Sequence, residues 1–217
     1  MTKLPTTLFK YTRREYADAM LKHGVFKIGT LHGFRRIEEL GSAVGDAGEG
    51  TKQVFDEATG HWRDITSRPN LAQAFISAPP DANITFSNVG FEVSYDIPDV
   101  FVYCVAATLS QRAMDAFEAD ACLEITDPKR FFKALDAALR ARHLVMNYLV
   151  GACIYDERRR HVRGDGGVHP AFLKPREYDY QCEIRCLWEP RARPIEPLLI
   201  ESLRAARLLR ERRLTSA

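Results

Sequence analysis

Apolar and polar positions follow a regular period in only a few stretches of this chain. Near the N-terminus, Leu8–Tyr11 and Val25–Gly29 each have the pattern of a short strand. Between them, Thr12 and Glu15 have the spacing of a capping box, in which the hydroxyl and the carboxylate bind free backbone N–H groups. We therefore predict a helix from this box to the residue before Gly24, since glycine adopts the left-handed conformation that ends a helix.

The middle of the chain contains one clear strand and two shorter candidates. Val100–Ala107 is a nearly continuous apolar run, which is typical of a strand covered on both faces. The segments Ile84–Phe86 and Phe91–Tyr95 look like strands that pair with each other around Asn88 and Gly90.

Three segments before these strands have weaker patterns. Leu31–Leu40 is predicted as a short helix, and Gly41–Gly50 as a glycine-rich loop that contains Asp46 and Glu49. Thr51–Pro80 mixes charged, proline and aromatic residues without a sustained period, so we predict a loop with short elements there.

The last half of the chain predicts two helices and a strand. Asp127 as N-cap and Pro128 at the first helical position begin a helix that we expect to end near Arg142. Its apolar stripe consists of Phe131, Phe132, Leu135 and Leu139. Leu149–Tyr155 has the composition of a buried strand, and Ser202–Arg213 has the pattern of an arginine-rich amphipathic helix.

The segment Tyr180–Trp188 alternates strictly between two faces. One face carries Tyr180, Cys182, Ile184, Cys186 and Trp188, and the other carries Gln181, Glu183 and Arg185. Because the apolar face anchors the strand to the core, the polar face must meet either solvent or a cleft. In a cleft, Glu183 would accept a hydrogen bond from a sugar hydroxyl and stabilise a developing cation, while Arg185 holds it ionised. Facing solvent, the same residues form an ordinary surface ion pair.

Composition limits the class of protein. The 217 residues are 46% apolar and 28% charged, which are ordinary values for one globular domain. The formal charge of +2 is too small to indicate nucleic-acid binding by itself, and no apolar run approaches the ~20 residues of a membrane span. Five cysteines without a C-x-x-C pair favour reduced, buried side chains. We therefore expect a single soluble α+β domain, 1–217, in the cytoplasm and away from membranes.

Three other groups of residues are candidates for chemistry. Lys10, Tyr11 and Thr12 lie at a strand end beside a helix start, where an anionic or nucleotide ligand can bind. The alternative is a lysine that reaches solvent, a core tyrosine and an N-cap threonine.

The acidic pair Asp46 and Glu49 is the second group, and with His32 or His61 it would coordinate a divalent metal. Its spacing matches no established metal motif, and G-x-x-x-x-G-K-[ST] is absent, so a glycine-rich surface loop is the simpler interpretation.

A basic, glycine-rich loop after Tyr155 is the third group. It contains Arg158, Arg159, Arg160, His161, Arg163, Gly164, Gly166 and Gly167. Such a loop can contact phosphates, although runs of charge are usually solvated.

The order of several short strings resembles a diverged bacterial and phage branch of the ADP-ribosyltransferase superfamily. These strings are Lys10-Tyr11-Thr12, Phe26-Lys-Ile-Gly29, Phe34-Arg35, Gly45-Asp46…Glu49-Gly50, Phe172-Leu-Lys174 and Tyr180-Gln181-Cys-Glu183-Ile-Arg185. The resemblance implies a split, mixed or antiparallel sheet with flanking helices, and NAD as the substrate.

The resemblance also implies roles for individual residues. Glu183 would be the catalytic glutamate that binds the nicotinamide ribose, and Gln181 would position the acceptor. Lys10, with Tyr11 and Thr12, would hold NAD, and Arg35 would contact the pyrophosphate. No metal is implied.

We therefore carry three hypotheses from the sequence. The first is an NAD-dependent ADP-ribosyltransferase or NAD glycohydrolase, whose acceptor is a protein, a nucleic acid or water, and by analogy a toxin or phage-defence effector. The second is a non-enzymatic module that binds NAD or ADP-ribose or docks a partner. The third is a metal-dependent nuclease that uses Asp46, Glu49 and His61.

Overall fold

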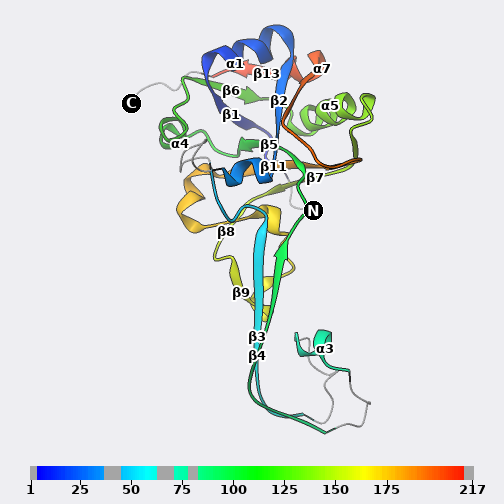
Figure 1. The fold of residues 1–217 in the computed structure, drawn as a ribbon. Helices are drawn as coiled ribbons and strands as arrows, with labels where there is room; N and C mark the ends of the chain where they lie inside the picture. Colours follow the sequence, from blue (N-terminus) through cyan, green and yellow to red (C-terminus); the bar gives the residue numbers. More distant parts are fainter. Residues whose placement is uncertain (1–3, 37–44, 63–70, 78–82, 213–217) are drawn as a thin grey trace.

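The computed structural model describes residues 4–36, 45–62, 71–77 and 83–212. It is a mixed α+β fold whose strands are mostly antiparallel, with a body and a long two-stranded arm that projects from it (Figure 1). None of the helices in the described part has the length and apolar character that a membrane span requires.

An eight-stranded sheet forms the centre of the body. Its strands are β1 (Leu8–Thr12), β2 (Val25–Thr30), β5 (Phe101–Ala106), β6 (Ala121–Ile125), β7 (Val145–Ala152), β11 (Glu183–Pro190), β12 (Leu198–Glu201) and β13 (Leu209–Glu211). All their pairings are antiparallel. The order along one path is β12-β2-β5-β1-β6-β13, and β11 lies between β5 and β7.

The sheet branches at β5. Phe101 and Val102 at its start pair with β2, whereas Ala106 at its end pairs with Phe9 of β1. The opposite edge of β5 pairs with β11 over its whole length. Two groups of strands, β2–β12 and β1–β6–β13, therefore diverge from one side of a single buried strand.

Helices cover both faces of this sheet. On one face lie α1 (Arg14–Asp18), which continues as a π-helix over Ala19–His23, α5 (Pro128–Ala141) and α7 (Leu203–Ala206). On the other face lies α4 (Gln111–Ala116), which packs against Tyr11 and Cys122. The hydrophobic core contains Phe26, Phe131 and Trp188, all fully buried. The apolar face of β11 therefore packs as the alternation predicts, and the strand is held firmly in place.

Short elements connect this core to the arm. They are the 3-10 helices His32–Arg35, Pro170–Phe172 and Arg176–Gln181, together with α6 (Val162–Asp165), β8 (Ile154–Tyr155), β9 (Arg159–His161) and β10 (Leu173–Lys174). β10 pairs with β8 in parallel, which places Lys174 beside Tyr155.

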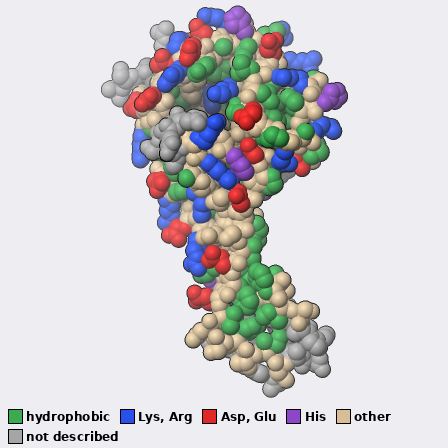
Figure 2. Space-filling view, viewed as in Figure 1, with side chains coloured by type: hydrophobic (Ala, Val, Ile, Leu, Met, Phe, Trp, Pro, Cys, Tyr) green, Lys and Arg blue, Asp and Glu red, His purple; other side chains and the backbone are tan. Residues whose placement is uncertain are grey.

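The arm consists of β3 (Thr51–Trp62) and β4 (Ile84–Asp96), with α3 (Ala72–Phe75) near its far end. At its base, β3 also pairs in parallel with β9 through Gln53, Val54 and Phe55. Figure 2 shows hydrophobic side chains gathered on one side of the arm near its far end. The small cluster there is built on Ala72 and Phe86.

Several predicted elements are confirmed. The first two strands, the strand at Val100–Ala107 and the helix from Asp127 to Arg142 have the expected positions. The Asp127 side chain accepts a hydrogen bond from the Arg130 N–H, as an N-cap does. Gly24 ends the first helix with φ of +66°.

The prediction of a capping box at Thr12 is wrong. The N-cap is Arg13, and its side chain makes no capping hydrogen bond. Thr12 instead belongs to β1 and pairs with Ala121 of β6. The strand therefore runs on to the residue that the capping box would have needed as its cap.

The middle of the chain is the largest error. Thr51–Pro80 is predicted as a loop with short elements; its first part is the long strand β3, whereas α3 is a short element as expected. Ile84–Phe86 and Phe91–Tyr95 do not pair with each other, because both belong to β4 and pair with β3. Asn88 has φ of +51°, so the turn signal marks an irregularity within one strand. The helix predicted over Leu31–Leu40 is confined to the short 3-10 helix, and its last four residues lie outside the described part.

Three predictions in the last third also need correction. The helix over Ser202–Arg213 is only the four residues of α7, since Leu209–Glu211 pairs with β6 as β13. The strand at Leu149–Tyr155 is divided into the end of β7 and β8, and β7 is largely exposed because it is an edge strand. The strand at Tyr180–Trp188 begins only at Glu183, since Cys182 has φ of +42°.

Candidate functional site: a buried charge cluster

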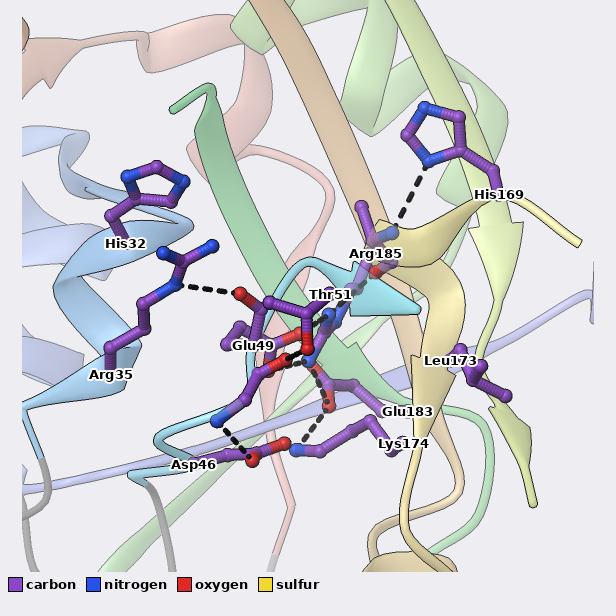
Figure 3. Close-up of polar contacts among 12 residues, drawn as sticks. His32, Arg35, Asp46, Glu49, Thr51, His169, Leu173, Lys174, Glu183 and Arg185 are labelled. Carbon is purple, nitrogen blue, oxygen red and sulfur yellow. Dashed lines mark hydrogen bonds and ion pairs between the residues drawn. The ribbon is translucent and has the colours of Figure 1, made fainter. Parts of the chain in front are cut away.

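The polar face of β11 meets neither open solvent nor an apolar surface. Glu183 is 7% exposed and Arg185 is 1% exposed. They lie beside the short strand β10, which carries Lys174, and beside the loop that carries Glu49 (Figure 3). We call these four residues, Glu49, Lys174, Glu183 and Arg185, the charge cluster.

Arg185 is the centre of the cluster. Its two terminal nitrogens bind the Glu49 carboxylate at 2.6 and 2.8 Å, and Nη1 also donates to the Ala171 carbonyl. Its Nε donates to Oε1 of Glu183 at 2.9 Å, and Nη2 lies 3.3 Å from Oε2. This planar guanidinium therefore joins two carboxylates in a fixed geometry.

Lys174 completes the hydrogen bonds of Glu183. Its Nζ is 3.0 Å from Oε2 of Glu183 and 2.7 Å from Oε1 of Gln181. It also lies 4.7 Å from the centre of the Tyr178 ring. The backbone N–H of Glu183 donates to the Tyr155 hydroxyl, which fixes the start of β11.

These contacts decide the charge state of Glu183. Burial by itself raises the pKa of a carboxyl group, but the charges of Arg185 and Lys174 and the hydrogen bond from Arg185 outweigh it. The net result is a pKa well below the usual range, so Glu183 is an ionised carboxylate inside the protein. Burial lowers the pKa of Lys174, but the charges of Glu183 and Glu49 and the hydrogen bond to Glu183 together outweigh this and leave the pKa raised, so Lys174 is protonated.

Lys10 lies at the margin of the cluster. Its Nζ donates to the Cys104 carbonyl at 2.9 Å and stands 4.9 Å from the centre of the Tyr103 ring. Burial lowers the pKa of this amine, and the Glu183 charge partly offsets the effect. The Cys104 thiol also interacts with the Glu183 carboxylate, while burial raises the pKa of the thiol well above its ordinary value.

Two of the predicted NAD-binding residues lie elsewhere. The Tyr11 hydroxyl donates to the Thr108 carbonyl and accepts from the Ser110 N–H, and its ring packs near Phe117. Burial raises the pKa of Tyr11 to about 12, so it is a neutral, structural phenol. Thr12 is at the far end of β1, paired with β6.

Arg35 contacts the charge cluster through the backbone of Glu49. Its Nε donates to the Glu49 carbonyl at 2.8 Å, and its Nη2 binds Asp96 at the base of the arm. Arg35 therefore supports the residue that holds Arg185.

The acidic loop does not form a metal site in the described structure. Asp46 binds Arg158 at 2.6 Å and Glu49 binds Arg185. Within the described ranges no group of three His, Cys, Asp or Glu side chains could hold a metal. The side chain of His61, another metal ligand expected from the sequence, lies outside the described residues.

The basic loop after Tyr155 is structured by ion pairs. Arg159 binds Glu92, and Arg160 binds Asp156. Since Arg158 is also paired, with Asp46, these arginines tie the base of the arm to the body.

The sequence predicts Glu183, Gln181 and Lys10 as parts of one site. The structure brings Gln181 and Glu183 together on Lys174, whereas Lys10 contacts the Cys104 carbonyl and the Tyr103 ring. From the sequence, no role is predicted for Lys174, and Glu49 is predicted only as a metal ligand. A signal for Lys174 was present, because it ends the apolar run Ala171-Phe172-Leu173, where a lysine needs a buried partner. Comparisons of the chain with protein-family models, curated proteins and solved structures gave no match.

Proposed function

We propose that the charge cluster is the reactive centre of an NAD-consuming enzyme, either an ADP-ribosyltransferase or an NAD glycohydrolase. The observation that carries this proposal is the carboxylate of Glu183, buried next to Gln181 and bound by the cations Lys174 and Arg185. The resemblance of Gln181-Cys-Glu183 to the glutamate motif of the superfamily gives the same two residues their roles. The division of the sheet at β5 agrees with the split sheet that this resemblance implies.

The chemistry needs a negative group near the nicotinamide ribose. When the bond between C1′ and the nicotinamide nitrogen breaks, the nitrogen keeps the electron pair and positive charge develops on the ribose. A carboxylate in a weakly polarisable site stabilises that charge far more than one in water. The acceptor, whether water or a nucleophile directed by Gln181, then forms the new bond to C1′ and loses its proton. In this proposal, as the resemblance implies, Lys10 would hold NAD and Arg35 would contact its pyrophosphate.

The test is nicotinamide release from NAD by the purified protein. We expect Glu183→Gln to reduce the rate at least 100-fold, as removal of one transition-state contact does in other enzymes. Glu189→Gln is the matched control, because Glu189 is on the same strand but exposed. A chelator should change neither rate. Release that is equal in the wild type and Glu183→Gln would rule out this site.

A second variant distinguishes ADP-ribose transfer to an acceptor from NAD hydrolysis. Gln181→Ala should reduce transfer to a protein or nucleic-acid acceptor more than it reduces NAD hydrolysis. An equal reduction of the transfer and hydrolysis rates would show that Gln181 does not position the acceptor.

The arm supports a second candidate function, a partner-docking module. Phe75 is 56% exposed and stacks on Phe91 at 5.8 Å. No charged residue occurs in the described ranges 71–77 and 83–91. This surface suits an apolar protein partner, and Phe75→Ser should weaken such a partner's binding while leaving nicotinamide release unchanged.

A further inference from the structure

The Lys174 ammonium occupies a hydrogen-bonding position on Oε2 of Glu183. Its ammonium group bridges the two side chains, Gln181 and Glu183, that the proposed function assigns to the reaction. The side chain is 4% exposed, so the site is closed in this state.

The two cations on Glu183 are held very differently. Arg185 is fixed by a bidentate pair with Glu49 and by the Ala171 carbonyl. Lys174 lies on the two-residue strand β10, and besides Glu183 its ammonium contacts the neutral Gln181 and the Tyr178 ring. Of the two, Lys174 is the one whose displacement breaks a single ion pair.

The charge balance shows what must replace it. Glu49 and Glu183 are negative, and Arg185 and Lys174 are positive, so the charge cluster is neutral as it stands. A lysine that left Glu183 without a new partner would be an uncompensated charge, which is costly inside a protein. An anion on the ligand removes that cost, because the ammonium exchanges a carboxylate for a phosphate.

We propose that Lys174 is a displaceable counter-ion that keeps the site closed until a phosphate-bearing ligand binds. This inference rests on the proposed function in taking Glu183 as the ribose-binding group. The Lys174 ammonium turns to the ligand's phosphate, and a ribose hydroxyl takes its place on Oε2 of Glu183. The device selects nucleotides with a pyrophosphate, such as NAD, over a riboside that lacks phosphate, because the latter offers Lys174 no partner.

The experiment uses ADP, which has phosphates but no nicotinamide ribose, and measures its affinity by calorimetry. We expect Glu183→Gln to bind ADP at least threefold more tightly than the wild type, since Lys174 no longer has to leave a carboxylate. Lys174→Met should bind ADP at least tenfold more weakly, and the double variant should match Lys174→Met. Lys52→Met is the matched control, because Lys52 is another buried lysine, paired with Asp165.

The outcomes separate this inference from the proposed function. Equal ADP affinity in the wild type and Glu183→Gln overturns the counter-ion role, even if nicotinamide is released. If the ADP affinities follow the expected order but no nicotinamide is released, the counter-ion role of Lys174 is supported and the proposed enzymatic activity is wrong. The Glu183→Gln comparison decides the question even if Lys174→Met fails to fold, and Lys174→Gln provides a second neutral variant.

Discussion

Glu49 and Arg185 are 136 positions apart and form a bidentate ion pair in which each side chain is 1% exposed. The pair joins the loop before the arm to the strand at the centre of the body. It also aims Nε of Arg185 at Glu183. One contact therefore determines both the position of the arm's base and the geometry of the candidate site.

We expect Glu49→Leu to reduce the free energy of unfolding by about 3–5 kcal/mol, because it leaves Arg185 without its main partner in the interior. Urea denaturation measures this. Glu211→Gln, which removes the exposed partner of Arg14, should leave stability nearly unchanged. A loss of less than ~1 kcal/mol for Glu49→Leu would mean that the pair is not buried as described.

The alternating pattern of β11 predicted which side chains share a face, but not what covers that face. The apolar positions Ile184, Cys186 and Trp188 are in the core, as expected. Glu183 and Arg185 looked equally suited to solvent, since Glu49 and Lys174, which bury them, come from distant segments. A single strand's period carries no information about partners that far along the chain.

The failures have related causes. At the base of β3 the buried positions are Lys52, Val54 and Asp56, and two of these three are charged, so the segment lacks the apolar alternation that identifies a half-buried strand. The C-terminal arginine-rich segment has a helical period, but Leu209–Glu211 adds to the edge of the sheet beside β6. There, pairing with a neighbouring strand overrides local helix preference.

The free energy of unfolding should depend on pH because Glu183 ionises. Its pKa in the folded protein lies below the ordinary value of 4.5, so its ionised form stabilises the fold above about pH 4.5. That contribution is lost as the pH falls below this value towards the folded-state pKa. We expect the stability difference between wild type and Glu183→Gln to be largest near neutral pH and to shrink as the pH falls from 5 to 3. Urea melts at these pH values measure it, and a difference independent of pH would contradict the charge assignment.

Cys182 should tolerate glycine better than any β-branched residue. Its φ of +42° lies in the left-handed region, where a Cβ atom costs about 1–2 kcal/mol. Cys182→Gly should therefore preserve or raise the unfolding temperature, and Cys182→Val should lower it. Because this turn separates Gln181 from Glu183, Cys182→Val should also reduce nicotinamide release. If both variants melted like the wild type, the left-handed turn would not exist in solution.

The arm should open independently of the body. Beyond Phe55, the described part of β3 has β4 as its paired strand, and two-stranded ribbons are marginally stable in water. The central strand β5 is paired on both edges and buried, so its amides open only with global unfolding. Hydrogen exchange should therefore be faster in Ile84–Gly90 than in Phe101–Ala106.

Phe86→Ala, which removes the buried ring of the arm's cluster, should speed exchange in the arm while leaving exchange in β5 unchanged. Ala206→Gly, in the core of the body, is the converse control and should speed exchange in β5. If Phe86→Ala accelerated exchange in both regions equally, the arm and the body would unfold as one cooperative unit.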